Sequence, residues 1–271
     1  MVLPKGVARR IGSVDAVMVD DGRPRSLAAG ATRRSWAWPR TALRATTGDD
    51  RPEAAHPEEQ RLVEGASTVR RDELARGRAC ARAALLDIGV DARDLPLLPD
   101  ARGAVRWPAG TTGSITHTTG WTGAVAARRA GWGGVSSIGL DAEAAHPLDD
   151  GVLEVVASAA ERREVDRLGS GDPAVPWSVV LHGAKEAVYK AVYPLWGELL
   201  DHDDVRVRLH RNRFVGRATG RGSRHLRVRG RWWTEGGTLV ALGVVRSVGA
   251  VRPLVPDLDP VRLETREVRG P

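Results

Sequence analysis

Three charged side chains in the segment 181–194, LHGAKEAVYKAVYP, have types and spacing that could do chemistry. The chain has 271 residues but only three lysines, and two of them, Lys185 and Lys190, flank Glu186 here. Lysine carries a compact, flexible ammonium where arginine offers a planar guanidinium. The alanines favour a helix that ends at Pro194, with Glu186 and Lys190 as i,i+4 neighbours. A helix face with these charges suits a metal-bound, phosphate-bearing substrate; an exposed ion pair is the alternative.

A second acidic pair lies at the end of a predicted strand, residues 136–143, with the sequence SSIGLDAE. Asp141 and Glu143 are i and i+2, so on a strand they project to the same side. Mg²⁺ typically binds one or two protein carboxylates and keeps waters and substrate phosphates as its other ligands. The pair therefore predicts a magnesium site, with a solvent-facing strand end as the alternative.

Arginines on a predicted helix within 57–89 offer candidate phosphate contacts. Arg70 and Arg78 are eight residues apart, which is about 12 Å along a helix axis and within about 80° around it. They could reach one phosphate if their side chains converge, whereas a solvated basic face is the alternative. Arg102 lies beside a turn glycine in the loop PDARG.

A glycine-rich turn, GTTGSITH at 110–117, leads into a short strand and ends in Thr116 and His117. Turn glycines allow a close approach of the backbone to an anion. The segment alone is more typical of a structural turn with an exposed histidine.

These side chains belong to a predicted mixture of helices and strands. Residues 19–55 are expected to be a loop or an insertion, and 249–271 a loose tail. Helices are expected at 57–89, 149–168 and 177–193, and strands at 110–117, 120–130, 134–140, 203–209, 213–219, 225–234 and 238–245.

Composition limits the function classes. A net charge of +7 fits an acidic protein partner or a polyanionic small molecule, and the sequence has no helix-turn-helix, zinc-ligand or aromatic–basic motif, so no nucleic-acid partner is expected. No apolar run is long enough for a membrane span, and the N-terminus has no apolar signal core. One cysteine, Cys80, fits a reducing cytoplasm.

Taken together, the segments WPAGTTGSITH, SIGLDAE and AKEAVYKAVYPL resemble the signature segments of the 4′-phosphopantetheinyl transferases, of the larger monomeric Sfp/EntD type. The likeness covers about residues 57–245. It implies an α+β fold of two similar subdomains related by a pseudo-twofold, with coenzyme A and the metal in the cleft between them. The subdomains would span 1–135 and 136–248.

The resemblance also implies an activity and its residues. The family transfers the phosphopantetheine arm of coenzyme A to a serine of an apo acyl or peptidyl carrier protein and releases 3′,5′-ADP, often for siderophore or secondary-metabolite synthesis. Matching the motifs residue by residue gives metal ligands Asp141, Glu143 and Glu186, catalytic groups Glu186, Lys190 and Asp141, and coenzyme A contacts Arg70, Arg78, Arg102, Thr116, His117, Lys185 and Lys190.

One departure from the family pattern is His182–Gly183, which replaces a phenylalanine–serine pair before AKE. Three other functions are alternatives. A basic nucleic-acid or anion-binding protein is one, and the sequence has no recognised reading element for it. A degenerate relative would bind coenzyme A without transferring its arm, although the acid and lysine sets are complete. A different magnesium-dependent phosphotransferase would need a nucleotide-binding loop, and no GxxxxGK[ST] motif is present. The sequence does not specify the carrier.

Overall fold

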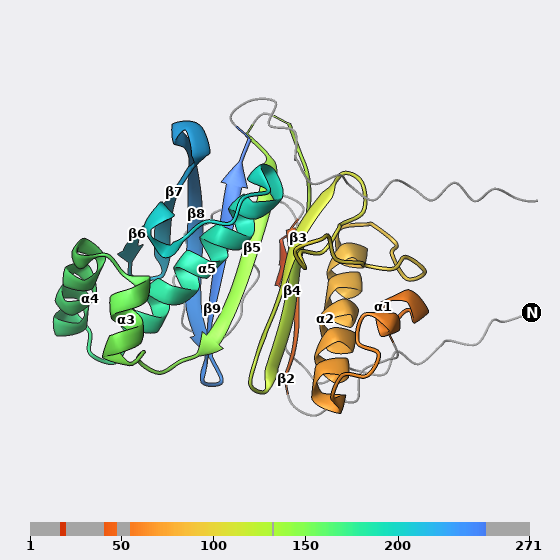
Figure 1. Cartoon of the computed structure of the whole chain (residues 1–271), viewed down its shortest axis with the longest axis horizontal. Coiled ribbons are helices and arrows are strands. Elements are labelled where there is room, and N and C mark those ends of the chain that lie inside the picture. The colour runs from red at the N-terminus through yellow and green to blue at the C-terminus, as the bar shows by residue number, and fades with distance from the viewer. Residues whose placement is uncertain (1–16, 20–40, 48–54, 132, 248–271) are drawn as a thin grey trace, which may run out of the picture.

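Two antiparallel sheets pack face to face, and helices cover their outer sides (Figure 1). The structure is a computed structural model, and it describes residues 17–19, 41–47, 55–131 and 133–247. The predicted tail at 249–271 and most of 19–55 lie outside these residues. Among the described residues, no helix is long and apolar enough to cross a membrane.

The first sheet has four strands in the order β1-β2-β4-β3, and helix α2 covers it. Its elements are β1 (Val17–Val19), β2 (Thr41–Thr47), α1 (Pro57–Arg61), α2 (Thr68–Asp87), β3 (Thr111–Thr118) and β4 (Trp121–Arg128). The Ser67 hydroxyl caps α2 by accepting from the Arg70 amide. Gly89 follows the helix with φ +75°, as expected for a helix stop. The apolar face of α2, including Ala81 and Leu85, packs on β4.

The second sheet has five strands in the order β5-β9-β8-β7-β6, and helix α5 lies along its outer face. Its elements are β5 (Val135–Ala144), α3 (Asp150–Val156), α4 (Ala159–Gly171), α5 (Trp177–Trp196), β6 (Val205–His210), β7 (Arg213–Gly220), β8 (Arg224–Glu235) and β9 (Thr238–Arg246). α5 can approach β5 closely because Gly139 has no side chain: a Cβ there would lie 2.1 Å from the Ala187 carbonyl oxygen.

Both sheets repeat one topology. A strand (β2 or β5) leads to a long helix (α2 or α5), then to an antiparallel meander whose last strand (β4 or β9) pairs with the first. The inner faces share one apolar layer, which includes Trp121 and Val125 from β4, Ile138 and Leu140 from β5, and Val240 from β9. The fold is α+β, as predicted. The predicted division between residues 135 and 136 falls one residue inside β5, close to the connection from β4, and stays a prediction.

Four local predictions were wrong. The helix expected at 57–89 is two helices, α1 and α2, separated by a turn at residues 62–67. Thr41–Thr47 is strand β2 and not a loop, because it pairs along its whole length with β4 and Arg44 bonds Asp87 of α2 at 2.5 Å. The helix expected at 149–168 breaks at Ala157, which has extended backbone angles. Pro194 does not end α5, which continues to Trp196 and stops at left-handed Gly197.

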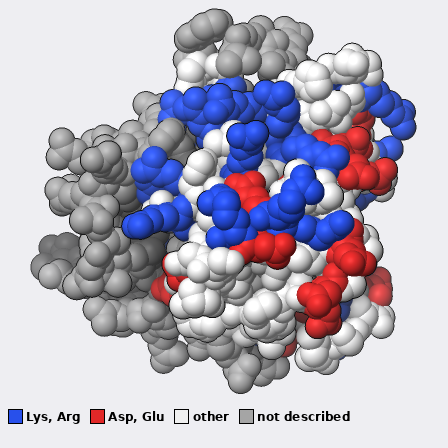
Figure 2. Space-filling model, turned by 90° about the vertical axis from the view of Figure 1, so that its left-hand side faces the viewer, with Lys and Arg blue, Asp and Glu red and all other residues white. Residues whose placement is uncertain are grey.

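Arginines gather in a broad band on the side of the molecule that carries α4 and β6 (Figure 2). Strands β6, β7 and β8 alternate buried apolar with outward residues, and Arg206, Arg217 and Arg227 are exposed cross-strand neighbours. This period of two places part of the chain's excess positive charge on one sheet face.

Candidate active site

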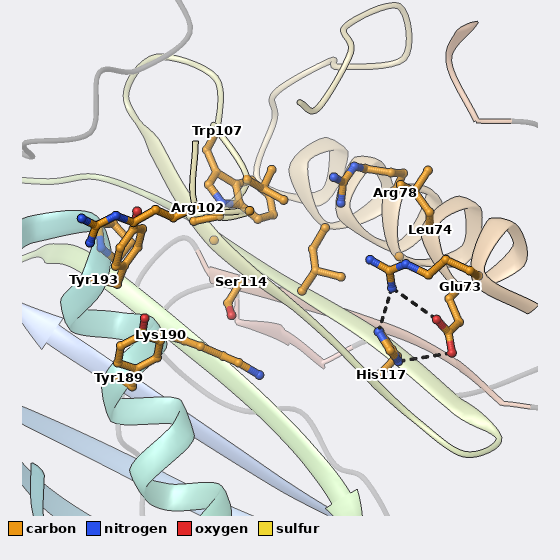
Figure 3. Close-up of a pocket in the computed structure, with 18 residues that line it drawn as sticks. Glu73, Leu74, Arg78, Arg102, Trp107, Ser114, His117, Tyr189, Lys190 and Tyr193 are labelled. Atoms are coloured by element: carbon orange, nitrogen blue, oxygen red, sulfur yellow. Dashed lines mark hydrogen bonds and ion pairs between the residues drawn. The ribbon is translucent and has the colours of Figure 1, made fainter. Parts of the chain in front are cut away.

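A cavity of about 340 Å³ opens where the two halves of the fold meet. Helix α2 and strand β3 line one side, α5 lines another, and the loop between Arg102 and Trp107 forms a rim (Figure 3). The predicted residues that line it are Arg70, Arg78, Arg102, His117 and Lys190. Three arginines, one lysine and one histidine of the predicted set therefore line the cavity.

Lys190 joins the two halves at the floor of this cavity. Its Nζ lies 2.6 Å from Asp141 Oδ1 on β5 and donates to Thr116 Oγ1 on β3 at 3.3 Å. Thr116 and Asp141 are buried, whereas the Lys190 side chain is 28% exposed. The structure thus brings three predicted site residues from three elements into direct contact.

Arg78 is a buried cation that points into the cavity from α2 (Figure 3). The residue is 8% exposed, and its nearest carboxylate, Glu59, is 3.9 Å from Nε. Burial lowers the pKa of Arg78, and Glu59 partly opposes this. A buried guanidinium with so distant a partner favours an anionic ligand, since a phosphate would supply the missing hydrogen bonds.

Arg70 and His117 lie together at the outer end of the cavity and share an acidic neighbour. Arg70 Nη1 is 3.3 Å from Glu73 Oε2 and 3.5 Å from His117 Nε2, and His117 Nδ1 is 3.7 Å from Glu73 Oε1 (Figure 3). All three side chains are partly exposed. Glu73 therefore holds the Arg70 guanidinium and the His117 imidazole in place from α2.

The carboxylates of β5 fit a divalent cation as a pair. Asp141 Oδ2 is buried without a hydrogen-bond partner, and Glu143 follows on the same side of the strand. Burial and the Asp141 charge raise the pKa of Glu143, and Glu186 adds to the effect. A cation between such carboxylates would relieve their mutual repulsion. His182 Nε2 lies 3.6 Å from Glu143 Oε1, so the residue that departs from the family pattern borders this pair.

Glu186 lies near this pair without joining it. Within the described residues, no group of three or more His, Cys, Asp or Glu side chains could hold a metal ion. Glu186 instead lines a neighbouring cavity of about 230 Å³, with Tyr189, Asp201 and His202. A three-carboxylate metal site would need Glu186 to change its side-chain orientation.

Lys185 is not brought to the cleft. It is 2% exposed, its Nζ lies 3.1 Å from Glu161 of α4, and it donates to the His202 carbonyl at 2.9 Å. Lys185 and Lys190 are five residues apart, which is about 140° around a helix, so they do not share a face. In this structure Lys185 joins α5 to α4 and does not contact the cavity predicted to hold coenzyme A.

Several cavity residues were missed by the sequence analysis. They are chiefly uncharged or acidic: Glu73, Trp107, Ser114, Tyr189 and Tyr193. Four of them could have been found, since Trp107 and Ser114 stand inside the quoted motif WPAGTTGSITH and Tyr189 and Tyr193 inside AKEAVYKAVYPL. Asp100 lies in the quoted loop PDARG, but its hydrogen bond from Tyr193 at 2.9 Å joins residues 93 positions apart, so the sequence gave no signal for that contact.

Comparisons with known proteins agree with this geometry. Residues 58–127 match a family model described as the 4′-phosphopantetheinyl transferase N-terminal domain, and residues 137–240 match the 4′-phosphopantetheinyl transferase superfamily. The chain is 36% identical over 195 residues to 4′-phosphopantetheinyl transferase PptT of Mycobacterium tuberculosis, which covers 68% of this chain and 83% of PptT.

Two further relatives match over a shorter part of their length. 4′-phosphopantetheinyl transferase Svp of Streptomyces mobaraensis is 44% identical over 159 residues, 59% of this chain and 63% of Svp. 4′-phosphopantetheinyl transferase Npt of Nocardia iowensis is 35% identical over 153 residues, 56% of this chain and 65% of Npt. The matched region thus spans slightly less than two thirds of these two relatives. The chain belongs to the 4′-phosphopantetheinyl transferase superfamily, a family of transferase enzymes, as the motifs predicted.

Proposed function

We propose that this protein transfers the 4′-phosphopantetheine arm of coenzyme A to a serine of an apo acyl or peptidyl carrier protein and releases 3′,5′-ADP. The observation that carries the proposal is the contact of Lys190 with both Asp141 and Thr116, at the junction of the two halves. It places a cation and a carboxylate beside a cavity whose walls carry arginines, as a metal-bound pyrophosphate requires.

The cationic side chains divide the work of binding coenzyme A. Arg78 and Arg70 line the cavity from α2, so they suit the 3′-phosphate. Lys190 lines it from α5 and contacts Asp141, so it suits the metal-bound pyrophosphate. Arg102 lies on the rim loop, next to the C-terminal end of α5, and would contact the nucleotide from there. His117 and Thr116 complete the β3 side. A charge-assisted bond to phosphate is roughly twice as strong as a neutral hydrogen bond.

The reaction forms one bond and breaks one bond at the phosphorus that carries the pantetheine arm. The serine oxygen bonds to this phosphorus, and the bond to the bridging oxygen breaks, which releases 3′,5′-ADP. Glu186, or a water held in the site, takes the serine proton. Lys190 stabilises the charge that builds on the bridging oxygen and donates a proton to it. A Mg²⁺ ion held by Asp141 and Glu143, with Glu186, would neutralise phosphate charge when bound.

The partner and setting follow from the same proposal. The carrier would be acidic, in keeping with a net charge of +7. A single buried cysteine, Cys80, is in keeping with a reducing cytoplasm. Because both walls of the cavity come from one chain, a monomer would suffice, as the sequence resemblance implies. Siderophore or secondary-metabolite pathways are the proposed setting.

A direct test mixes the protein with coenzyme A, MgCl₂ and a panel of apo carrier domains, and measures carrier mass by mass spectrometry. Addition of one phosphopantetheine group, lost when EDTA replaces Mg²⁺ and when the acceptor serine is replaced by alanine, is the expected result. Coenzyme A binding by calorimetry without modification of any carrier would favour the alternative, a coenzyme A-binding protein that does not transfer.

A further inference from the structure

The Asp100 carboxylate fixes the shape of the rim loop, residues 99–105, and also holds this loop to helix α5. Asp100 Oδ1 accepts from the backbone amides of Arg102 at 2.8 Å and Ala104 at 2.9 Å, which fixes the turn. Its Oδ2 accepts from the hydroxyl of Tyr193 on α5 at 2.9 Å. The loop ends pair through a bridge between Pro99 and Val105. Both carboxylate oxygens of Asp100 therefore accept hydrogen bonds, Oδ1 from the loop itself and Oδ2 from helix α5.

A second contact holds the same loop to the end of the same helix. Arg102 Nη1 donates to the carbonyl of Gly197 at 3.1 Å, and Gly197 is the left-handed residue that ends α5. Carbonyls at a helix C-terminus carry partial negative charge and favour a cation. Arg102 is otherwise exposed, so these contacts decide where its guanidinium lies.

The loop and the helix line adjoining parts of the cavity and touch each other through the two contacts above. Arg102 and Ala104 line it on the loop side, and Lys190 and Tyr193 line it on the α5 side (Figure 3). Tyr193 is 7% exposed, and burial together with the hydrogen bond to Asp100 raises its pKa to about 12. The hydroxyl thus stays protonated at neutral pH and remains a donor to Asp100.

We propose that the Asp100–Tyr193 hydrogen bond is a latch that holds the rim loop on α5 and so positions Arg102 for the anionic ligand of the cavity. This inference rests on the proposed function in taking that ligand to be coenzyme A. A loop already fixed in the free protein loses less conformational freedom when the ligand binds, and this favours tighter binding. Tyr193 and Asp100 are positioning residues, and neither takes part in bond making.

The first test is Tyr193→Phe in the full chain, which removes the hydroxyl and keeps the ring. We expect the Kd for coenzyme A to rise about three- to tenfold, as expected for part of one hydrogen bond to a charged group. The kcat at saturating coenzyme A and the KM for the carrier should change less than about twofold. Hydrogen exchange at the Arg102 and Ala104 amides, which donate to Asp100, should become faster.

A double-mutant cycle then isolates the pair. In an Asp100→Ala background, Tyr193→Phe should have no further effect on Kd, because the acceptor is already gone. Tyr189→Phe is the matched control: it removes the hydroxyl of the chain's other tyrosine, on the same helix, and should change Kd by the same factor in both backgrounds.

The outcomes separate the latch from the proposed function. Additive effects of Tyr193→Phe and Asp100→Ala, or a fall in kcat with unchanged Kd, would overturn the latch. If the wild-type protein bound no coenzyme A, the proposed function would fail on its own. The exchange measurement would then decide the latch, because unchanged exchange at Arg102 and Ala104 in Tyr193→Phe overturns it without any ligand.

Discussion

The two carboxylate oxygens of Asp141 have different surroundings. Oδ1 contacts Lys190, whereas Oδ2 is buried without a partner. A buried acceptor without a hydrogen bond is unfavourable, so its retention here is best explained by a ligand that the site is built to bind.

Asp141→Asn tests this use directly. The amide keeps the shape of the side chain but removes the charge, so transfer should fall at least about 100-fold, since each 1.4 kcal/mol of lost charge stabilisation is a factor of ten. The measurement is the initial rate of carrier modification across a range of Mg²⁺ concentrations, with the Tm recorded alongside. Asp166→Asn, on the exposed side of α4, is the matched control. Ordinary turnover by Asp141→Asn at low Mg²⁺ would remove Asp141 from the metal site.

Lys190 is expected to matter more for the reaction than for folding. Its side chain is partly exposed, so Lys190→Ala should lower the Tm only modestly but reduce kcat by about 10²–10³-fold, as loss of one charge-stabilising donor does. Lys190→Arg keeps the charge and tests whether a compact ammonium is needed. Stopped-flow or discontinuous transfer assays would give kcat, and circular dichroism the Tm. A Tm loss that accounts for all the lost activity would give Lys190 a structural role.

At the scale of elements, the sequence predicted the order of most helices and strands and placed Asp141, Thr116 and Lys190 on elements that do converge. Residue types and spacing were enough to place these three residues, because each motif lies within one helix or strand. They failed for Lys185, whose direction depends on the 140° rotation between it and Lys190 and on Glu161 of another helix. They also failed for β2, whose pairing with β4 is a long-range contact.

Helices α4 and α5 and strand β6 meet at a buried ion pair. Burial raises the pKa of Glu161, but bonds from the Val207 amide and from Ser158, together with the Lys185 ammonium, bring the net pKa below the usual value. Burial lowers the pKa of Lys185, against the opposing effect of Glu161. The pair thus connects three elements through charges that are almost inaccessible to water.

This linkage predicts an acid-dependent stability. Because the folded-state pKa of Glu161 is lower than in the unfolded chain, its contribution is present above the unfolded pKa and is lost as the pH falls through the folded one. Glu161→Gln should therefore be less stable than wild type at pH 7, since Lys185 loses its partner, yet should lose less further stability below about pH 4.5. Urea unfolding from pH 3 to 7 gives the two curves; parallel curves would show that Glu161 does not titrate with folding.

At the scale of the whole molecule, the candidate active site draws on both halves, since Lys190 contacts β3 and β5 and the cavity walls come from α2 and α5. The halves share an apolar layer that includes Leu140, next to Asp141. Ser114 of β3 donates to the Leu140 carbonyl at 3.4 Å, which adds a polar contact to this layer. A split along this layer would separate Asp141 and Glu143 from the residues of β3.

We therefore expect the described fold to unfold as one cooperative unit. Leu85→Ala in the first half, Leu239→Ala in the second and Leu140→Ala between them each remove a side chain that is 0% exposed. Each should lower the unfolding free energy by about 2–5 kcal/mol and shift the same single transition. Far-UV circular dichroism and tryptophan fluorescence should report coincident curves, with calorimetric and van't Hoff enthalpies equal. Two transitions, of which Leu85→Ala moves one and Leu239→Ala the other, would show that the halves fold independently and that the cleft forms only by docking.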